Sequence, residues 1–246
     1  MLTNKDAKLI NSLLKKKYRQ KYNKFVVEGI KNVTEVLESS VKVHRIFSTE
    51  NLFPDYESIT EIISLNELKK ISQQITPNMV LALCELPDEK KIQSDKLILV
   101  LDDVRDPGNL GTIIRTADWF GIRQIICSKE TVDVFNPKVI QSSMASFTRV
   151  QLNYVDLKDF FEQYKYPVLG AFMDGNSIYS TFLPQNAALL MGNEANGISD
   201  ELLPYITQKI SIPLLSEIQQ TESLNVAMAT GIILGEMASQ KLRNQL

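Results

Sequence analysis

Short, uninterrupted apolar runs in the second half of the chain constrain its fold more than any other feature. Residues 97–101 contain no polar side chain, which suits a strand of a parallel sheet that is covered by helices on both faces. Further strands are predicted at residues 124–127, 148–152, 168–172, 188–191 and 209–212. Helical segments separate these strands, so the pattern predicts βαβ units and an α/β fold.

The predicted helices of this half lie near residues 110–120, 137–145, 156–164 and 199–204, with a long last helix over 222–241. The first half alternates in the same way, with helices at 5–17, 30–38 and 66–73 and strands at 25–29, 43–47, 59–63 and 79–84. Residues 86–96 between the halves are polar and include a proline. This stretch predicts a boundary between a small α/β domain, residues 1–88, and a larger one, residues 97–246.

Composition excludes several classes of protein. The 246 residues are 44% hydrophobic and 23% charged, close to the average of globular domains. No apolar run approaches the roughly 18 residues of a membrane-spanning helix, and the first residues lack a signal-peptide core. These features predict a cytoplasmic protein. Cys84 and Cys127 are then expected to be buried, unpaired thiols.

A single histidine, His44, limits the chemistry that the chain can perform. Its surroundings predict a strand, so His44 is expected to be structural. A Ser-His-Asp triad, a histidine-rich zinc site or a histidine base would have to use His44 or be absent. No cluster of side chains has the spacing of metal ligands, so no metal is expected.

Positive charge is concentrated at the amino terminus. Residues 1–31 hold nine Lys or Arg and two acidic residues, and the rest of the chain carries a net negative charge. Such a basic segment favours a polyanionic partner, and Lys16, Arg19 and Lys21 are candidate RNA contacts. The aromatic residues among these cations, Tyr18, Tyr22 and Phe25, could stack on bases. The alternative is a solvated helix face with inward-packing aromatic residues.

Three polar loops follow predicted strands, where open α/β sheets bind their ligands. The first loop spans residues 102–112. Asn109 in this loop is a plausible cap for the next helix, and Arg115 lies farther along that helix. This loop has neither a phosphate-loop nor a dinucleotide-binding pattern. If it stood alone, Asn109 could simply be a cap and Arg115 a surface charge.

The second loop brackets Glu194 with Gly192 and Gly197, and glycine lets the backbone approach a ligand closely. The third begins at Ile212 and ends at the last helix, which Thr221 or Ser223 could cap. Backbone N–H groups at the start of that helix also offer an anion site.

Taken together, these segments resemble the SpoU (TrmH-like) family of RNA ribose 2′-O-methyltransferases, in the SPOUT superfamily. The matching residues are Asn109 with Arg115-Thr116-Ala117 and Gly121, then Gly192-Asn193-Glu194 with Gly197, then Ile212-Pro213 with Ser223-Leu224-Asn225-Val226-Ala227. They stand in the family's order over residues 97–241. The first half, with residues 25–29, resembles the family's substrate-binding domain, a small α/β fold related to RNA-binding ribosomal proteins.

The resemblance implies a trefoil-knotted carboxy-terminal domain that binds S-adenosylmethionine and pairs as a homodimer, with Arg115 of one subunit completing the site of the other. The implied substrate is structured RNA, ribosomal RNA in preference to transfer RNA. Gln141 stands where the family would have a basic residue. The implied cofactor-binding residues are Met191, Gly192, Ile212, Pro213, Leu214 and Leu224, and the implied catalytic residues are Asn109, Arg115, Glu194, Ser223 and Asn225.

Two roles for Arg115 remain open. The family is often described with this arginine as the base that takes the 2′-hydroxyl proton, but a guanidinium normally stays protonated. Binding an RNA phosphate with two parallel hydrogen bonds is physically easier.

Two other functions also fit the sequence. A non-catalytic RNA-binding protein that kept the fold would not bind S-adenosylmethionine. An ordinary α/β enzyme acting on a small phosphorylated or nucleoside substrate would be active without RNA.

Overall fold

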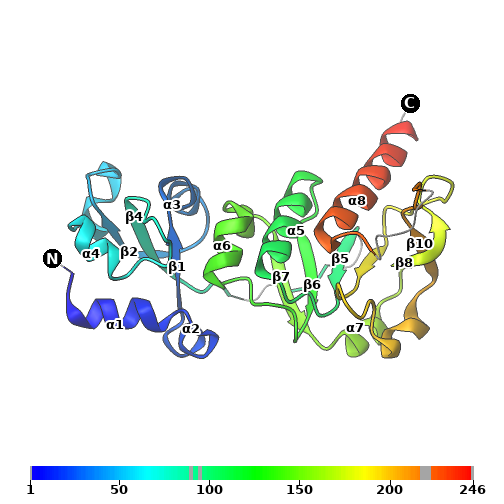
Figure 1. Ribbon diagram of the computed structural model, residues 1–246, viewed down its shortest axis with the longest axis horizontal. Coiled ribbons are helices and arrows are strands. Elements are labelled where there is room, and N and C mark those ends of the chain that lie inside the picture. Colours follow the sequence, from blue (N-terminus) through cyan, green and yellow to red (C-terminus); the bar gives the residue numbers. More distant parts are fainter. Residues whose placement is uncertain (1, 89–90, 94–95, 217–222, 245–246) are drawn as a thin grey trace. The chain divides into compact units, whose positions relative to one another are not determined.

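The computed structural model describes residues 2–88, 91–93, 96–216 and 223–244 (Figure 1). Contacts group the chain into two compact units. Unit 1 comprises Met1–Glu89 and Asp133–Arg149, and unit 2 comprises Lys90–Val132 and Val150–Leu246. The boundary predicted at residues 86–96 stays a prediction, and the structure adds that residues 133–149 pack within unit 1. Among the described residues, none of the helices combines the length and apolar character that crossing a membrane requires.

Unit 1 is built on a four-stranded sheet in the order β1-β4-β2-β3. Strand β4 runs antiparallel to β1 and β2, and β3 runs parallel to β2. Ile10 of α1, Leu13 directly after it and Leu68 of α4 form a core with the sheet residues Phe47 and Leu81. Helix α3 packs against β1 and β4. The elements are α1 (Asn4–Ser12), α2 (Lys16–Tyr22), β1 (Lys24–Glu28), α3 (Ile30–Leu37), β2 (Val43–Ser48), η1 (Pro54–Ile59), β3 (Thr60–Ile62), α4 (Leu65–Lys69) and β4 (Val80–Glu85).

The helix predicted over residues 5–17 is two helices, because Arg19 stabilises a break between them. Its Nη1 donates to the backbone oxygens of Leu13, at 2.7 Å, and Leu14, at 3.0 Å. Carbonyl groups at a helix end have no partner within the helix. The Nε of Arg19 donates to Oδ2 of Asp133 at 3.1 Å.

The prediction that Arg19 contacts RNA is therefore wrong, because the residue is 3% exposed and its guanidinium is held inside unit 1. Lys16 and Lys21 are exposed on α2 and stay predicted RNA contacts.

Residues 133–149 supply part of the core of unit 1, although they follow strand β6 (Gln124–Ser128) along the chain. They contain α6 (Pro137–Ser143) and the 3₁₀ turn η2 (Ser146–Thr148). The rings of Phe135 and Phe147 lie 4.6 and 5.9 Å from the ring of Phe25, centroid to centroid. Arg149 also donates to Oε2 of Glu35 at 2.8 Å. Phe25 is fully buried in this contact, so it packs inward and does not stack on RNA.

Unit 2 confirms the predicted parallel α/β sheet. Its six strands lie in the order β10-β8-β9-β5-β6-β7, and every neighbouring pair is parallel. Strand β7 begins three residues later than predicted, because η2 occupies residues 146–148. The strands are β5 (Ile98–Leu101), β6 (Gln124–Ser128), β7 (Gln151–Val155), β8 (Val168–Ser177), β9 (Ala188–Met191) and β10 (Gln208–Ser211).

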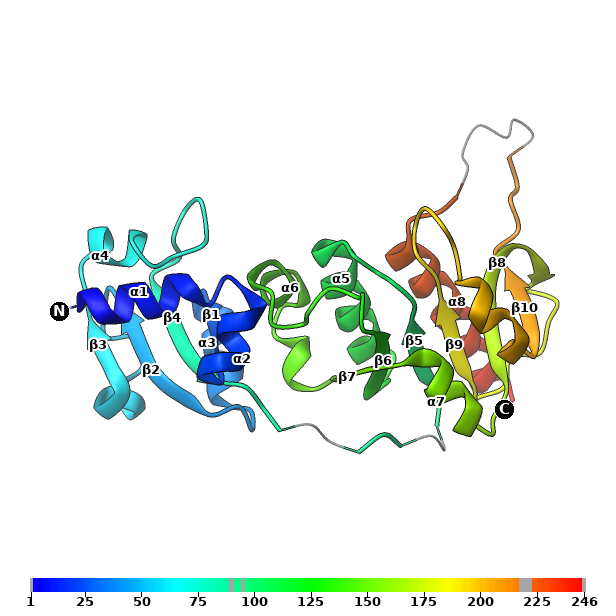
Figure 2. The same cartoon turned by 90° about the horizontal axis from the view of Figure 1, so that it is seen from below.

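Helices cover both faces of this sheet (Figure 2). Helices α5 (Pro107–Trp119) and α8 (Val226–Arg243) pack side by side. On the opposite face lie α7 (Leu157–Gln163) and the 3₁₀ helix η3 (Asp200–Tyr205), which share a core with every second residue of β5. Burial on two faces explains why the strand residues 98–101 are all apolar. The trefoil knot stays a prediction.

The two cysteines are buried, whereas the single histidine is exposed. Cys84 and Cys127 are buried and unpaired, as predicted, and burial raises the pKa of both thiols. His44 lies in β2, with its Nδ1 3.8 Å from Oε1 of Glu85. Among the residues described, His, Cys, Asp and Glu form no group of three or more that could hold a metal ion.

Candidate active site

Three loops of unit 2 begin at the carboxyl ends of β5, β9 and β10. These strands are parallel members of one sheet, so their carboxyl ends lie at one edge. Most of the site residues predicted in this half of the chain lie in these loops or at the starts of α5 and α8, which follow two of them. Met191 is the last residue of β9, and Arg115 lies farther along α5.

A chain of hydrogen bonds joins three of the predicted catalytic residues. The Nδ2 of Asn109 donates to Oε1 of Glu194 at 2.6 Å. The Nδ2 of Asn225 donates to Oδ1 of Asn109 at 2.9 Å. Asn109 thus connects the loop after β9 to the start of α8. The structure brings together residues that are 85 and 116 positions apart in sequence.

Asn109 is free for this role because a different residue caps α5. The N-cap is Asp106, which accepts a hydrogen bond at 2.8 Å from the backbone nitrogen of Asn109. The prediction that Asn109 is the cap is therefore wrong. Capping by Asp106 satisfies the helix and leaves the Asn109 amide to bind other side chains.

Helix α8 begins four residues later than predicted, and Asn225 is its cap. The Oδ1 of Asn225 accepts from the backbone nitrogens of Ala227, at 3.0 Å, and Met228, at 3.3 Å. Ser223 is therefore not the cap, and Thr221 lies outside the described residues. The same amide caps the helix and binds Asn109, so the start of α8 is tied to the candidate site.

The turn that carries Glu194 is fixed by Asn193. The Oδ1 of Asn193 accepts from the backbone nitrogens of Ala195, at 2.9 Å, and Asn196, at 3.1 Å. Its Nδ2 donates to the backbone oxygen of Asp103 at 2.8 Å. Such internal bonds make the turn rigid, which holds Glu194 within reach of Asn109.

The far end of this turn is anchored by Asp102. This buried carboxylate accepts from the backbone nitrogen of Ser199 at 2.7 Å. Sequence reasoning assigned no role to Asp102, Asn193 or Asp106. The available signals were an acidic residue directly after a buried strand and an aspartate immediately before a proline that begins a helix.

Gly192 has no room for a side chain. A Cβ placed there would lie 2.3 Å from the carbonyl carbon of Gly197 and 2.4 Å from the nitrogen of Ile198. Paired backbone hydrogen bonds between Asn193 and Gly197, both 2.9 Å, hold these segments together. Only glycine allows the turn to close so tightly.

Arg115 lies on the exposed side of α5 and is not part of the Asn109–Glu194–Asn225 network. Its guanidinium forms no hydrogen bond or ion pair with the residues that the structure describes. All five donors of its side chain are therefore available to a ligand or to another subunit.

The predicted cofactor residues are positioned by the same loops. Met191 is buried at the end of β9, and Gly192, Ile212 and Pro213 are partly buried. Leu214 and Leu224 are each 48% exposed, and Ser223 is exposed beside Leu224. Backbone polar groups and exposed leucines, with the carboxylate of Glu194 in the loop after β9, suit a flat heterocycle joined to a cationic group. S-adenosylmethionine has this chemistry, so these residues fit it.

Two family profiles match the chain. The SpoU rRNA Methylase family matches residues 96–235. The MRM3-like substrate binding domain matches residues 4–82.

Among curated proteins, the chain is 33% identical over 240 residues to the 23S rRNA (guanosine(2553)-2′-O)-methyltransferase RlmP of Bacillus subtilis, with 94% of this chain and 95% of that protein covered. Among solved structures, it is similar to a putative RNA methyltransferase of the TrmH family from Porphyromonas gingivalis, with TM-score 0.86, 38% identity and coverage of 96% and 98% of the two chains. It is also similar to an AdoMet-bound rRNA methyltransferase from Sinorhizobium meliloti, with TM-score 0.85, 29% identity and coverage of 98% and 96%.

Proposed function

Because the chain belongs to the SpoU rRNA methylase family, we propose that it transfers a methyl group from S-adenosylmethionine to a ribose 2′-hydroxyl of ribosomal RNA. One observation of the structure carries this function. Asn109, Glu194 and Asn225, three positions that the family resemblance makes catalytic, converge through two hydrogen bonds at the carboxyl edge of the sheet. Ribosomal RNA is favoured over transfer RNA.

The chain uses S-adenosylmethionine, which supplies a methyl group bonded to a sulfonium. A sulfonium is already a good leaving group, so the transfer of the methyl group needs no metal. We place its contacts on backbone groups of Gly192, Ile212 and Leu224. The side chains of Met191, Pro213 and Leu214 flank the same site. Gly192 brings backbone close to the cofactor because it has no Cβ.

The reacting ribose is positioned by the polar network. Glu194 is exposed and keeps acceptor capacity beyond its bond to Asn109. Ser223 and Asn225 form the other side of the site. Correct orientation of reacting groups contributes about 7–11 kcal/mol to such a step. The network therefore acts mainly by holding the 2′-oxygen in line with the methyl group.

We assign Arg115 to an RNA phosphate next to this ribose. Its five donors have no partner among the described residues, and a planar guanidinium binds phosphate with two parallel hydrogen bonds. The nearby positive charge also stabilises the negative charge on the 2′-oxygen as the hydroxyl proton passes to the carboxylate of Glu194, which has acceptor positions left beyond its bond to Asn109.

Methylation mapping tests the proposed function. The protein is incubated with isotopically labelled S-adenosylmethionine and ribosomal RNA from cells that lack it, and the RNA is mapped by mass spectrometry. We expect label on a ribose 2′-oxygen at a defined nucleotide. Equilibrium dialysis with labelled S-adenosylmethionine measures whether the protein binds this cofactor. A non-catalytic RNA-binding protein would bind none, and it would leave the RNA unlabelled. A small-substrate enzyme would instead be active without RNA.

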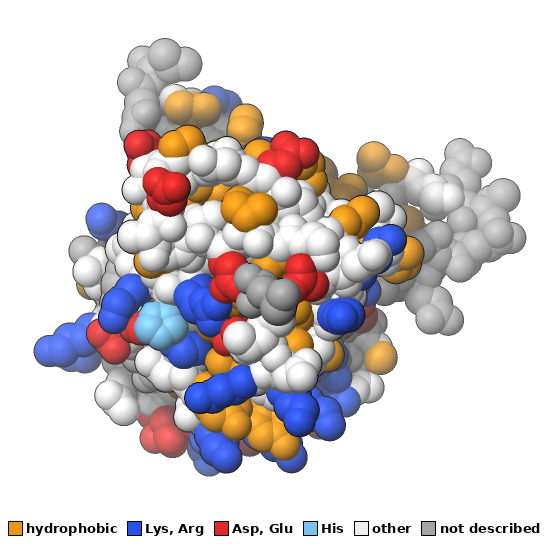
Figure 3. Space-filling view, turned by 90° about the vertical axis from the view of Figure 1, so that its left-hand side faces the viewer, with side chains coloured by type: hydrophobic (Ala, Val, Ile, Leu, Met, Phe, Trp, Pro, Cys, Tyr) orange, Lys and Arg blue, Asp and Glu red, His pale blue; other side chains and the backbone are white. Residues whose placement is uncertain are grey.

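Unit 1 is the proposed RNA-binding part. It matches a substrate-binding domain, and exposed Lys16 and Lys21 on α2 can neutralise phosphates. Figure 3 shows Lys and Arg side chains interspersed with apolar ones over much of its lower surface. Such mixed surfaces suit a nucleic-acid backbone with unstacked bases. A cytoplasmic location, expected from the sequence, agrees with this substrate.

We also propose that the chain forms a homodimer through unit 2. Large apolar side chains are exposed on its two neighbouring helices, with Trp119 of α5 at 85% and Met228 of α8 at 61%. Thr116 and Gly231 mark the contact between these helices. Large exposed apolar side chains on neighbouring helices favour an interface, and the proposed dimer brings Arg115 of one subunit to the site of the other.

The variant with both Trp119→Glu and Met228→Glu is expected to be a folded monomer, because two buried charges would oppose association. Sedimentation equilibrium measures the change from twice the chain mass of 27.9 kDa to that mass. Ile62→Glu is the matched control, since Ile62 is 53% exposed on β3 of unit 1. A double variant that remained dimeric would place the interface elsewhere.

A further inference from the structure

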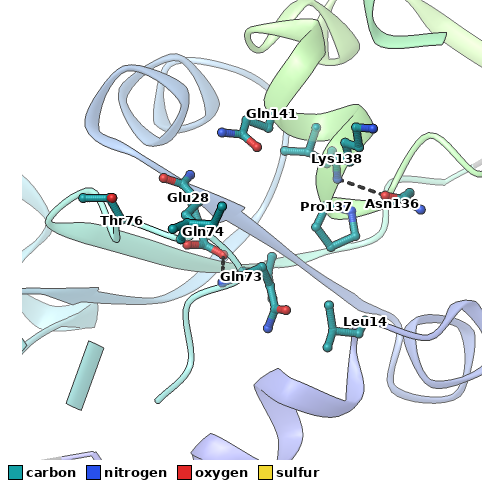
Figure 4. A pocket seen from close by; sticks show the side chains of 12 residues that line it. Leu14, Glu28, Gln73, Gln74, Thr76, Asn136, Pro137, Lys138 and Gln141 are labelled. Atoms are coloured by element: carbon teal, nitrogen blue, oxygen red, sulfur yellow. Dashed lines mark hydrogen bonds between the residues drawn. The ribbon is translucent and has the colours of Figure 1, made fainter. Parts of the chain in front are cut away.

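Unit 1 contains a cavity of about 680 Å³ that the proposed methyl-transfer site does not use. This volume lies within the range of about 300–1,000 Å³ typical of small-molecule sites. The wall is formed by the end of β1, residues 73–76 and helix α6, and all of these segments belong to unit 1. Figure 4 shows Glu28 near Gln73 and Gln74, with Gln141 facing them from α6.

The lining is rich in neutral amides. Gln73, Gln74, Asn136 and Gln141 supply both donors and acceptors, while Lys138 is the one cation among the lining residues. Proteins bind phosphates mainly with cations and backbone N–H groups, and they recognise base edges with amides and carboxylates. Gln141 faces this cavity from α6 with a neutral amide, which can both donate and accept. This lining therefore favours the edge of a base over a phosphate.

Glu28 presents a fixed pair of acceptors. Its Oε1 accepts from the backbone nitrogen of Gln73 at 2.8 Å, and its Oε2 accepts from Oγ of Ser72 at 2.6 Å. Each carboxylate oxygen has two acceptor positions, so one remains on each oxygen. Two adjacent acceptors match two adjacent donors. Among the four RNA bases only guanine has such an edge, formed by its N1–H and N2–H groups.

An exposed apolar side chain stands beside these polar groups. Ile75 lines the cavity and is fully exposed, and Leu14 and Ile140 add apolar wall. A nucleobase has a polar edge and two apolar faces, so its shape and chemistry complement this arrangement.

We propose that this cavity binds an unstacked guanine of the substrate RNA, whose N1–H and N2–H donate to the carboxylate of Glu28. Gln141 contacts another polar group of the same base. This inference rests on the proposed function for its choice of RNA as the ligand. The bound guanine is a different nucleotide from the methylated one, because the cavity lies in unit 1 and the candidate active site in unit 2.

Four short RNAs test the inference with the full-length protein. Fluorescein-labelled UUGUU, UUAUU, UUCUU and UUIUU, in which I is inosine, are titrated by fluorescence anisotropy. Inosine keeps the N1–H of guanine and lacks its 2-amino group. We expect UUGUU to bind about tenfold or more tighter than UUAUU and UUCUU, with UUIUU intermediate, because hydrogen bonds to a charged acceptor are strong. Equal affinities, or no measurable binding of any probe, overturn the inference.

Glu28→Gln gives the decisive variant. Glutamine keeps the size of the side chain and can still bond to Ser72 and Gln73, so the fold is retained. It replaces one acceptor by a donor, and the preference for UUGUU is expected to disappear while UUAUU binding is unchanged. Glu57→Gln, at an exposed position of η1, is the matched control. Retained guanine preference in Glu28→Gln would also contradict the proposal.

Gln141→Arg provides a second variant on the exposed surface of α6. The added cation is expected to increase the affinity for all four RNAs and to reduce the ratio between the affinities for UUGUU and the other probes. The assay separates this inference from the proposed function. A protein that methylates ribosomal RNA without guanine preference contradicts the cavity assignment alone, whereas one with guanine preference but without methylation contradicts the proposed function.

Discussion

Arg115→Lys is expected to lower the turnover number for RNA methylation about 10- to 100-fold. Hydrogen bonds to charged groups contribute about 1.5–3 kcal/mol each, and a loss of about 1.4 kcal/mol in the transition state slows a step tenfold. Lysine keeps the charge but cannot form the two parallel bonds of a guanidinium. Turnover is measured under saturating RNA and S-adenosylmethionine.

The fold is expected to survive this change, because Arg115 is exposed and has no partner among the described residues. The melting temperature should therefore stay at the wild-type value. Arg123→Lys is the matched control, since Arg123 is also an exposed arginine of unit 2 and pairs with Asp118 at 3.2 Å. Full turnover in Arg115→Lys would refute both a phosphate clamp and a catalytic role.

Gly192→Ala is expected to abolish most S-adenosylmethionine binding and to destabilise the protein. The new Cβ would overlap backbone atoms of Gly197 and Ile198, at 2.3 and 2.4 Å, so the turn must open. Overpacking typically costs about 1–3 kcal/mol of stability. An opened turn would also move Glu194 away from Asn109. Calorimetric titration with S-adenosylmethionine and thermal unfolding measure the two effects.

Gly231→Ala is the control for this substitution. A Cβ at Gly231 would meet Cγ2 of Thr116 at 3.8 Å, an ordinary contact, and alanine favours a helix over glycine by about 1 kcal/mol. Normal cofactor affinity in Gly192→Ala would show that the tight turn is not part of the pocket.

Combining a defect at Arg115 with one at Gly192 also tests whether Arg115 acts across the proposed dimer. Mixed dimers are prepared from one Arg115→Ala subunit and one Gly192→Ala subunit. If Arg115 acts on the partner's site, the first subunit keeps an intact pocket and receives the second subunit's arginine, so activity returns. If Arg115 acts within its own subunit, each site in the mixed dimer has a defect and activity stays low.

Local sequence patterns predict much of the larger sheet, because its strands are buried on both faces. The segments 98–101 and 188–191 are wholly apolar and form β5 and β9. The break after α1 could not be predicted in the same way. It depends on Arg19 reaching Asp133, a residue 114 positions away, and no local pattern contains that contact.

The candidate site was predictable as a set of loops, but its bonding was not. Asp106 and Asn109 are both good helix caps, and sequence alone does not decide between them. The structure makes Asp106 the cap, and this choice leaves Asn109 to bind Glu194 and Asn225. Similarly, a buried Phe25 and a base-stacking Phe25 have the same sequence pattern, and only long-range packing distinguishes them.

The place of residues 133–149 inside unit 1 has a consequence for protein engineering. A chimaera that exchanges only the first 88 residues between relatives would pair a foreign Phe25 and Arg19 with the recipient's Phe135, Phe147 and Asp133. Mismatched partners there would leave a void in the core or a buried guanidinium without its counter-ion. Grafting a new RNA specificity onto this scaffold therefore requires moving two separate stretches of sequence together.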